Sequence, residues 1–233
     1  MTIAQNLYSI RQNINAAIKR RQGGPFATGD SVKLIAVTKT QPIELIREAL
    51  DYEMVAVGEN RIQEAIIKKP QLDPAVEWHL IGHLQTNKSR QAVELFDLIH
   101  SVDSERLACE LDLQAKKINK RQHILLQVNV AGEESKYGIP PKIDQILHLA
   151  RIISAQEHLV LCGLMTIAPF LEDPGDLRPV FRELYNIFGE LQAYGLPDTK
   201  IQWLSMGMTN DYRIAVEEGA NMVRIGSGIF GTR

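Results

Sequence analysis

The stretch Leu34–Pro42, LIAVTKTQP, joins an apolar run of strand-forming residues to a lysine and then to a proline. Behind the proline, Ile43, Ile46 and Leu50 follow at the i, i+3, i+7 spacing of an amphipathic helix, and proline suits the first turn of a helix. A buried strand followed by a helix is the repeating unit of parallel α/β folds. The stretch therefore predicts a strand–helix unit with Lys39 at the carboxyl end of the strand.

The same unit recurs along the chain, and this recurrence decides the fold class. Most of the strand-length runs are almost continuously apolar, as parallel strands covered on both faces are. Amphipathic stripes separate them, and an extra helix precedes the first. Eight strands alternating with helices in 233 residues predict a (β/α)8 TIM barrel of one domain, residues 1–233, with an extra N-terminal helix. The strands are expected at 32–38, 54–58, 76–82, 98–102, 123–130, 159–166, 200–205 and 221–226.

A doubly wound open sheet is the alternative architecture. Such sheets commonly carry a glycine-rich fingerprint after the first strand, and Thr38-Lys39-Thr40 is not one. The barrel is therefore favoured over the open sheet.

Composition argues against several functional classes. Hydrophobic residues make up 45% and charged residues 23%, and the formal net charge of −2 gives no electrostatic case for nucleic acid or an anionic membrane. The N-terminus lacks the apolar region of a signal peptide, and no run approaches the ~20 apolar residues of a membrane span. Cys109 and Cys162 lack CxxC spacing, so we expect free thiols and a cytoplasmic protein.

Polar and glycine residues gather at the predicted carboxyl ends of the strands, where TIM barrels build their active sites. Lys39 ends the first strand and Asn60 follows the second, while the last two strands end in Ser205-Met206-Gly207 and Gly226-Ser227-Gly228. Barrels often bind phosphate between the loops after strands seven and eight, through backbone N–H groups. The two loops therefore predict a phosphate site; tight strand-to-helix turns are the alternative.

Lys39 and Arg224 suggest what the phosphate belongs to. A lysine at the barrel mouth, partly desolvated and near other cations, becomes nucleophilic toward a carbonyl. Arg224 lies within the last strand, NMVRIG, and must either pair with an acid or face a ligand. Lys39 combined with the predicted phosphate site predicts a phosphorylated aldehyde held as a Schiff base. Pyridoxal 5′-phosphate and a sugar phosphate in an aldolase-type site both fit, and the residues alone do not separate them.

Other catalytic signatures are weaker. His79 and His83 lie four residues apart, which on a strand running into a loop spans ~13 Å, too far for one metal ion. Packing or loop hydrogen bonding is the expected role, and no metal site is predicted. Thr209 and Asp211 are typical of helix capping, and the serine motifs lack the GxSxG pattern of a nucleophile elbow.

Taken together, the motifs make a specific pattern. The chain resembles the pyridoxal phosphate homeostasis protein family, which is related by fold to the barrel of alanine racemase. The resemblance covers essentially the whole chain, with Thr209 standing where serine is usual. The matching segments are Ala36–Pro42 (AVTKTQP), Gly58–Ala65 (GENRIQEA), Trp78–Lys88 (WHLIGHLQTNK), Asn129–Ile139 (NVAGEESKYGI), Gly163–Pro169 (GLMTIAP) and Ser205–Gly231.

The resemblance implies a barrel of the alanine racemase type with pyridoxal 5′-phosphate in its mouth. Lys39 matches the Schiff-base lysine, Asn60 a residue beside the cofactor, and Arg224 the arginine that faces the pyridine nitrogen. A permanently cationic guanidinium disfavours protonation of the ring nitrogen, which makes the ring a weaker electron sink. The phosphate cradle is matched by Ser205, the Met206 backbone, Gly226 and Ser227.

Two functions remain open: a non-catalytic carrier that buffers the cofactor as a lysine aldimine, and an amino-acid racemase. A two-base racemase needs a second acid or base. Alanine racemase takes its tyrosine from a separate domain of the partner subunit, and this sequence stops at Arg233, just after the phosphate loop. We therefore favour a monomeric carrier that contacts pyridoxal phosphate-dependent apoenzymes transiently. Lys136 is a candidate second amine that assists transfer; a solvated loop lysine is its alternative.

Overall fold

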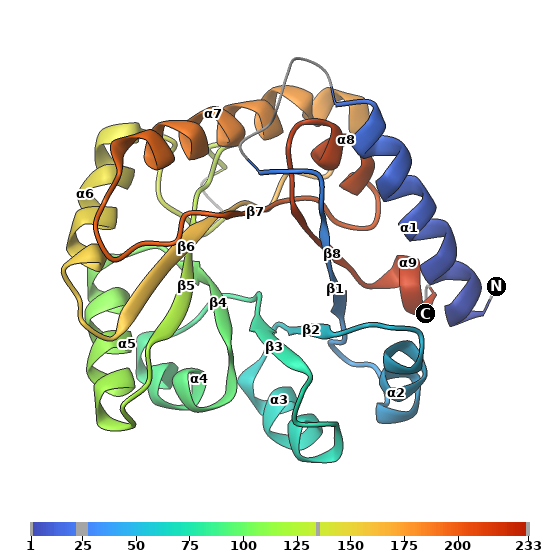
Figure 1. Cartoon of the computed structure of the whole chain (residues 1–233), viewed down its shortest axis with the longest axis horizontal. Coiled ribbons are helices and arrows are strands. Elements are labelled where there is room, and N and C mark those ends of the chain that lie inside the picture. Colours follow the sequence, from blue (N-terminus) through green and yellow to red (C-terminus); the bar gives the residue numbers. More distant parts are fainter. Residues whose placement is uncertain (1, 22–27, 134–135, 232–233) are drawn as a thin grey trace.

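Pairing of the last strand with the first closes the sheet. The computed structural model describes residues 2–21, 28–133 and 136–231. In it, eight parallel strands pair in chain order, β1 to β8, and β8 returns to β1 through the register Leu34–Val223 and Ala36–Ile225 (Figure 1). This closure confirms the predicted barrel and excludes the open sheet.

The strands lie where the apolar runs predicted them, and most are shorter than those runs. The fifth shows why: the ladder ends at Gln127, and the next residue, Val128, forms an isolated bridge with Ile139 instead. The strands are β1 (Lys33–Val37), β2 (Ala56–Glu59), β3 (Glu77–Leu80), β4 (Leu98–Val102), β5 (Gln122–Gln127), β6 (Leu159–Met165), β7 (Trp203–Ser205) and β8 (Met222–Ile225).

Helices alternate with the strands and surround them. Ser104 caps α5 by accepting the N–H of Leu107, and Gly195 ends α7 in the left-handed conformation. The helices are α1 (Ile3–Lys19), α2 (Ile43–Asp51), α3 (Ile62–Lys68), α4 (Ser89–Leu95), α5 (Glu105–Lys117), α6 (Ile143–Ser154), α7 (Arg178–Tyr194), α8 (Tyr212–Glu217) and α9 (Ser227–Phe230), with 3-10 turns η1 (Lys69–Gln71), η2 (Thr86–Lys88) and η3 (Pro174–Leu177).

The extra helix α1 packs beside α8 and α9, near the closure of the barrel (Figure 1). A capping box formed by Thr2 and Gln5 begins it, and the Asn6 side chain donates to the Ile229 carbonyl at 2.8 Å. Its buried face includes Ala17, and the neighbouring Ile18 is only partly buried.

Two apolar layers hold the barrel. Outward-facing strand residues pack with the helices, and a smaller cluster that includes Ile35, Leu125 and Met222 fills part of the interior. Inward-facing positions also carry buried polar side chains, among them His100 and Arg224. A barrel interior is ordinarily filled by branched apolar residues, so these polar groups stand out.

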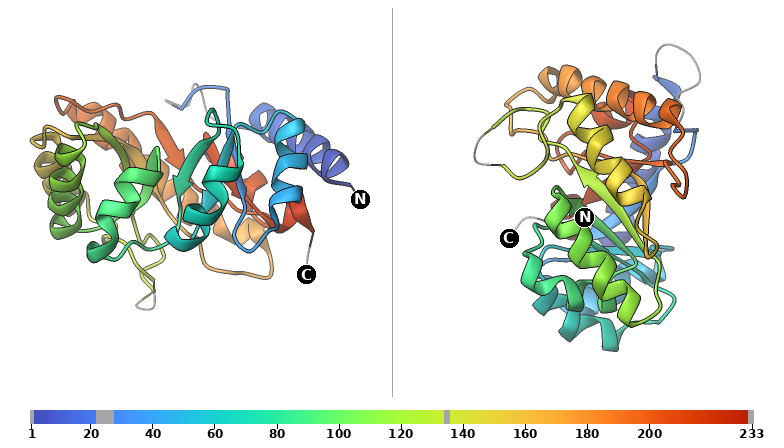
Figure 2. Two further views of the ribbon diagram at one scale, coloured as in Figure 1. Left: turned by 90° about the horizontal axis from the view of Figure 1, so that it is seen from below. Right: turned by 90° about the vertical axis from the view of Figure 1, so that its left-hand side faces the viewer.

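All strands are parallel, so their carboxyl ends meet at one end of the barrel. Figure 2 shows the segments that follow β5 and β6 projecting from that same end. Over the ranges that the structure describes, no helix has the length and apolar character needed to cross a membrane. Both cysteines are free, and burial raises the pKa of the Cys162 thiol to about 11.

Gly163 tests the contact between β6 and β7. Its φ is +146°, and a Cβ there would lie 1.9 Å from the Trp203 carbonyl oxygen. Gly163→Ala is therefore expected to lower the free energy of unfolding by about 3 kcal/mol through strain and overpacking. Gly189→Ala is the control: this site on α7 has no atom within 4 Å of the new Cβ, and alanine there should add up to about 1 kcal/mol. Denaturant titration measures both, and unchanged stability in Gly163→Ala would contradict the described strand contact.

Candidate functional site

Lys39 is the second residue after the end of β1, and its side chain is exposed at the carboxyl end of the barrel. Its ammonium makes no hydrogen bond or ion pair with any residue in the described part of the chain. The partial desolvation expected from the sequence is thus not observed. Thr40, the next residue, has a φ of +61°, an uncommon conformation for a residue with a branched Cβ.

A pocket of about 400 Å³ lies beside Lys39. The volume falls within the range of small-molecule sites. One wall comes from the end of β1 and the other from the loop after β8, so barrel closure brings together the lysine and the predicted phosphate loop. The lining residues are Val37, Lys39, Thr40, Gln41, Gly226, Ser227 and Gly231.

The loops after β7 and β8 meet at Thr209. The hydroxyls of Ser227 and Thr209 lie 3.3 Å apart, and the Gly228 N–H donates to Thr209 Oγ1 at 3.3 Å. A Cβ at Gly228 would lie 2.9 Å from Ile225 Cγ2, so glycine permits this close approach. Sequence reasoning gave Thr209 a capping role; its position in the loop after the seventh strand was the available signal for a place beside Ser227.

Ser205 and Met206, both predicted in the phosphate cradle, have partners inside the barrel. Ser205 Oγ lies 2.6 Å from Arg224 Nη1 and 3.1 Å from His100 Nδ1, and the Met206 N–H donates to the Met222 carbonyl at 3.1 Å. Neither residue lines the pocket beside Lys39. The structure therefore brings together only the β8 part of the predicted cradle, with Thr209 added.

Arg224 is 3% exposed, and its guanidinium donates to Ser205 Oγ and, at 2.8 Å, to the Thr166 carbonyl. Burial lowers its pKa to about 10, although the nearby Asp211 carboxylate acts in the opposite direction. No carboxylate oxygen of a described residue lies within 4 Å of the guanidinium. The ion-pair alternative is thus not supported, and the cation keeps its charge at neutral pH.

Asn60 and Lys136 do not line the pocket. The Asn60 backbone packs on Gly82, where a Cβ would lie 2.3 Å from the Asn60 carbonyl oxygen. Lys136 Nζ pairs with Glu133 Oε1 at 2.8 Å within the loop after β5. Glu134 and Ser135 of the same motif lie outside the described residues.

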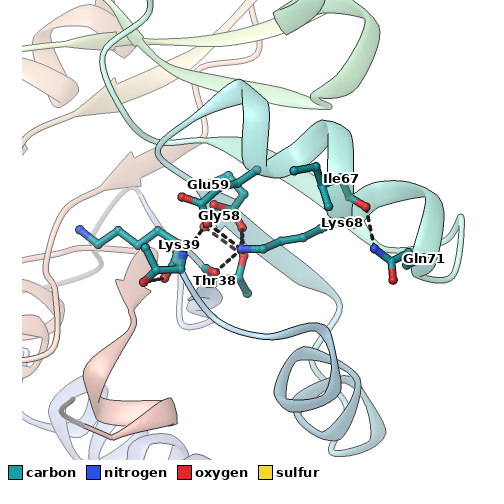
Figure 3. Close-up of polar contacts among 9 residues, drawn as sticks. Thr38, Lys39, Gly58, Glu59, Ile67, Lys68 and Gln71 are labelled. Atoms are coloured by element: carbon teal, nitrogen blue, oxygen red, sulfur yellow. Dashed lines mark hydrogen bonds and ion pairs between the residues drawn. The ribbon is translucent and has the colours of Figure 1, made fainter.

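Directly behind Lys39, a cluster of charged groups holds the end of β1. Lys68 Nζ donates to Glu59 Oε1 at 2.8 Å, to Glu64 Oε2 at 2.8 Å and to the Thr38 carbonyl at 2.7 Å. Figure 3 shows the Lys68 ammonium beside Thr38 and Glu59, and the Lys39 side chain pointing away from them. The cluster fixes the backbone on both sides of Lys39, because the Thr40 N–H donates to Glu64 as well.

The two carboxylates of this cluster respond to opposite influences. Burial raises the pKa of Glu59, against hydrogen bonds from Lys68 and the Thr38 hydroxyl. Burial also acts on Glu64, but hydrogen bonds from Lys68 and the Thr40 N–H outweigh it and lower that pKa. The i, i+4 spacing of Glu64 and Lys68 was a signal for their pairing, whereas Glu59 has no local signal.

His79 and His83 have separate environments, and only His83 has the packing role expected of the two. His79 is buried, with Nδ1 2.8 Å from His100 Nε2, while the His83 ring stacks on Tyr137 with centroids 3.6 Å apart. Within the described residues, no group of three His, Cys, Asp or Glu side chains is arranged to hold a metal ion.

Lys68→Met tests the charged cluster. Removing the ammonium leaves Glu59 buried without its cation, and breaking such a pair typically costs about 3–5 kcal/mol. We expect denaturant titration to show a loss of unfolding free energy of about 3 kcal/mol, the lower end of this range, because the Thr38 hydroxyl still donates to Glu59. Adding Glu59→Gln should restore part of the stability, since the uncompensated charge is removed. Equal stability of the single and double variants would contradict a buried charge pair.

The buried histidines predict a dependence of stability on pH. Burial lowers the pKa of both His79 and His100, which face Glu77, Asp97, Lys33 and Arg224. The unfolded chain then binds more protons below the ordinary histidine pKa of about 6.5, so the stabilisation present above that pH is lost as pH falls. Unfolding free energies at pH 7.5 and 5.5 measure this loss. A double variant, His79→Phe with His100→Phe, should lose less unfolding free energy between these two pH values than the wild-type protein. The same loss in both proteins would contradict the assignment of this pH dependence to the two histidines.

Known proteins with similar sequences belong to the family that the motifs of this chain indicate. The family model described as alanine racemase, N-terminal domain, matches residues 5–233. The pyridoxal phosphate homeostasis protein of Pasteurella multocida is 40% identical over 236 aligned residues, covering 100% of this chain and 98% of that protein. The protein of the same name from Aquifex aeolicus is 40% identical, covering 100% and 99%.

A solved structure agrees with the sequence comparison. PipY of Synechococcus elongatus, described as having PLP bound, is 37% identical, covers 99% of this chain and 100% of its own, and superposes with a TM-score of 0.83. Sequence identity at this level over the full length shows homology as well as a shared fold. The chain belongs to the pyridoxal phosphate homeostasis protein family, with the barrel of the alanine racemase N-terminal domain.

Proposed function

We propose that this chain binds pyridoxal 5′-phosphate covalently through Lys39, as a Schiff base, and serves as a carrier and buffer of the cofactor. One observation carries the proposal: an exposed amine, without a partner among the described residues, opens onto a pocket whose other wall is the glycine–serine loop after β8. The homeostasis proteins to which the chain is related, and PipY with PLP bound, support it.

The residues at the site fit the groups of this cofactor. When bound, pyridoxal phosphate supplies an aldehyde that condenses reversibly with amines. Lys39 provides the amine, and the Ser227 and Thr209 hydroxyls with the loop backbone would hold the phosphate. Arg224 would face the ring nitrogen, with Asn60 beside the ring. A sugar phosphate would leave the buried guanidinium of Arg224 without a role.

Chemical turnover is disfavoured by the same residues. A cationic Arg224 opposes protonation of the ring nitrogen and so weakens the ring as an electron sink. Racemisation through two bases needs an acid or base in addition to the lysine. Among the described residues that line the pocket, Lys39 is the one ionisable side chain. These features support the carrier over the racemase.

The wider setting belongs to the same proposal. We infer a single-domain, monomeric, cytoplasmic carrier that meets pyridoxal phosphate-dependent apoenzymes transiently. The free thiols of Cys109 and Cys162 support a reducing compartment. Lys136 would assist transfer once it leaves Glu133, a contact of two partly exposed side chains that is weak in water.

Reduction with borohydride tests the covalent site. Pyridoxyl label should appear on Lys39 in the wild-type protein and in Lys136→Ala, and should vanish in Lys39→Ala, as mapped by mass spectrometry. Label on another lysine in the wild-type protein, or none, would overturn the assignment of Lys39.

Two kinetic measurements separate carrier from enzyme. Incubation of the loaded protein with D- and L-amino acids should show no racemisation at enzyme-like rates; turnover at such rates would favour the racemase. Transfer of the cofactor to an apoenzyme should be slower from Lys136→Ala than from the wild-type protein, and unchanged transfer would remove Lys136 from the proposal.

A further inference from the structure

Five side chains form a continuous polar chain through the barrel interior. His79 Nε2 lies 2.9 Å from Glu77 Oε1, His79 Nδ1 lies 2.8 Å from His100 Nε2, and His100 Nδ1 lies 3.1 Å from Ser205 Oγ. Arg224 Nη1 completes the chain by donating to Ser205 Oγ at 2.6 Å. The chain runs from β3 through β4 and β7 to β8.

The chain begins in water and ends in the core. The Glu77 side chain at the start of β3 is 34% exposed, and its second oxygen pairs with Lys33 Nζ at 2.6 Å. The two histidines and Ser205 are 0% exposed, and Arg224 is 3% exposed. Buried polar groups are stable only when partnered, so each link of this chain matters for its neighbours.

The two ends fix the direction of the three hydrogen bonds and of the contact between His79 Nε2 and Glu77, which has the distance of an ion pair but not the alignment of a hydrogen bond. Arginine only donates, so Ser205 Oγ accepts from Arg224. The contact with His79, together with Lys33, lowers the pKa of Glu77 to about 2 against burial, so its carboxylate only accepts. The single hydrogen of Ser205 then goes to His100 Nδ1, His100 Nε2–H donates to His79 Nδ1, and His79 Nε2–H faces Glu77.

The opposite direction fails at both ends. With the proton on Nδ1 of each histidine, the bare Nε2 lone pair of His79 would face a carboxylate oxygen at 2.9 Å. Ser205 would receive two donors, from His100 and Arg224, and its own hydrogen would have neither of them as acceptor. The burial of both imidazoles, which lowers their pKa, keeps them neutral and suits the first arrangement.

The chain is not a path for protons. Arginine does not give up a proton under ordinary conditions, so a chain that ends at Arg224 has no exit at that end. What a fixed direction does supply is orientation, because an acceptor held by a hydrogen bond to His100, which is in turn hydrogen-bonded to His79, limits where the guanidinium can point.

We propose that Glu77, His79 and His100 are positioning residues, which hold the Ser205 hydroxyl as an acceptor and thereby set the Arg224 guanidinium toward the cofactor ring. The part concerning the cofactor rests on the proposed function above. A consequence follows for Ser205: its one hydrogen is used by His100, so the hydroxyl orients Arg224 and has none to donate to the phosphate.

The direction of the chain is measurable in the protein without cofactor. Nitrogen-15 NMR of histidine-labelled protein at pH 7.5 reports which ring nitrogen carries the proton, with each signal assigned from a His79→Phe or His100→Phe variant. Both histidines should be neutral with the proton on Nε2. A proton on Nδ1 of either ring, or a charged ring, would overturn the inference.

Substitution then tests the link to the cofactor. His100→Phe keeps a ring but removes both hydrogen bonds, and His148→Phe, at an exposed position on α6, is the matched control. In His100→Phe the absorption band of bound pyridoxal phosphate and its pH dependence should shift, with dissociation about tenfold faster, as loss of a hydrogen bond to a charged group implies. His148→Phe should match the wild-type protein.

A second variant guards against a folding defect. Ser205→Ala removes only the hydroxyl and should produce the same spectral shift as His100→Phe. A wild-type spectrum and dissociation rate in folded Ser205→Ala or His100→Phe would overturn the positioning role. Failure of the wild-type protein itself to bind pyridoxal phosphate would instead overturn the proposed function, while the NMR measurement still decides the direction of the chain.

Discussion

The site depends on the pairing of β1 with β8. This pairing joins residues almost the whole chain apart, Lys33 with Met222 and Ala36 with Ile225. Lys39 follows β1 by two residues and Ser227 follows β8 by two, so the register that closes the barrel also places the amine beside the glycine–serine loop. An open sheet with the same strands would separate these two groups.

Two polar networks flank this closure and act on different parts of the site. On the helix side, Lys68 and its two carboxylates hold the backbone before and after Lys39, and none of the described residues pairs with the Lys39 amine. Inside the barrel, the chain from Glu77 to Ser205 holds Arg224. Both networks place charged side chains in the interior, where a charge is stable only when it is paired. Together they account for an exposed amine at the mouth of the barrel and a fixed, buried cation in its interior.

Much of the fold was predictable from the sequence because apolar runs and helical stripes are local signals. Eight strands, the extra helix, the Ser104 cap and the Gly195 helix end follow from patterns within a few residues. The placement of Lys39 beside the loop after β8 was predictable too, once a barrel was assumed. The predicted phosphate cradle was only partly correct. Ser205 was assigned to it because it lies at a strand end, but the alternation of side chains along a strand turns Ser205 into the barrel, toward His100 on β4. Pairs such as Lys68 with Glu59, and His79 with His100, depend on strand register, which the sequence does not state.

The account predicts one arrangement of the bound cofactor, and a crystal structure of the protein with pyridoxal phosphate tests it most directly. Continuous electron density should join Lys39 Nζ to the aldehyde carbon, with the phosphate against Ser227 and Thr209, and the ring nitrogen facing an Arg224 still hydrogen-bonded to Ser205. Density joining the cofactor to another lysine, or a phosphate held outside the loops after β7 and β8, would contradict the account.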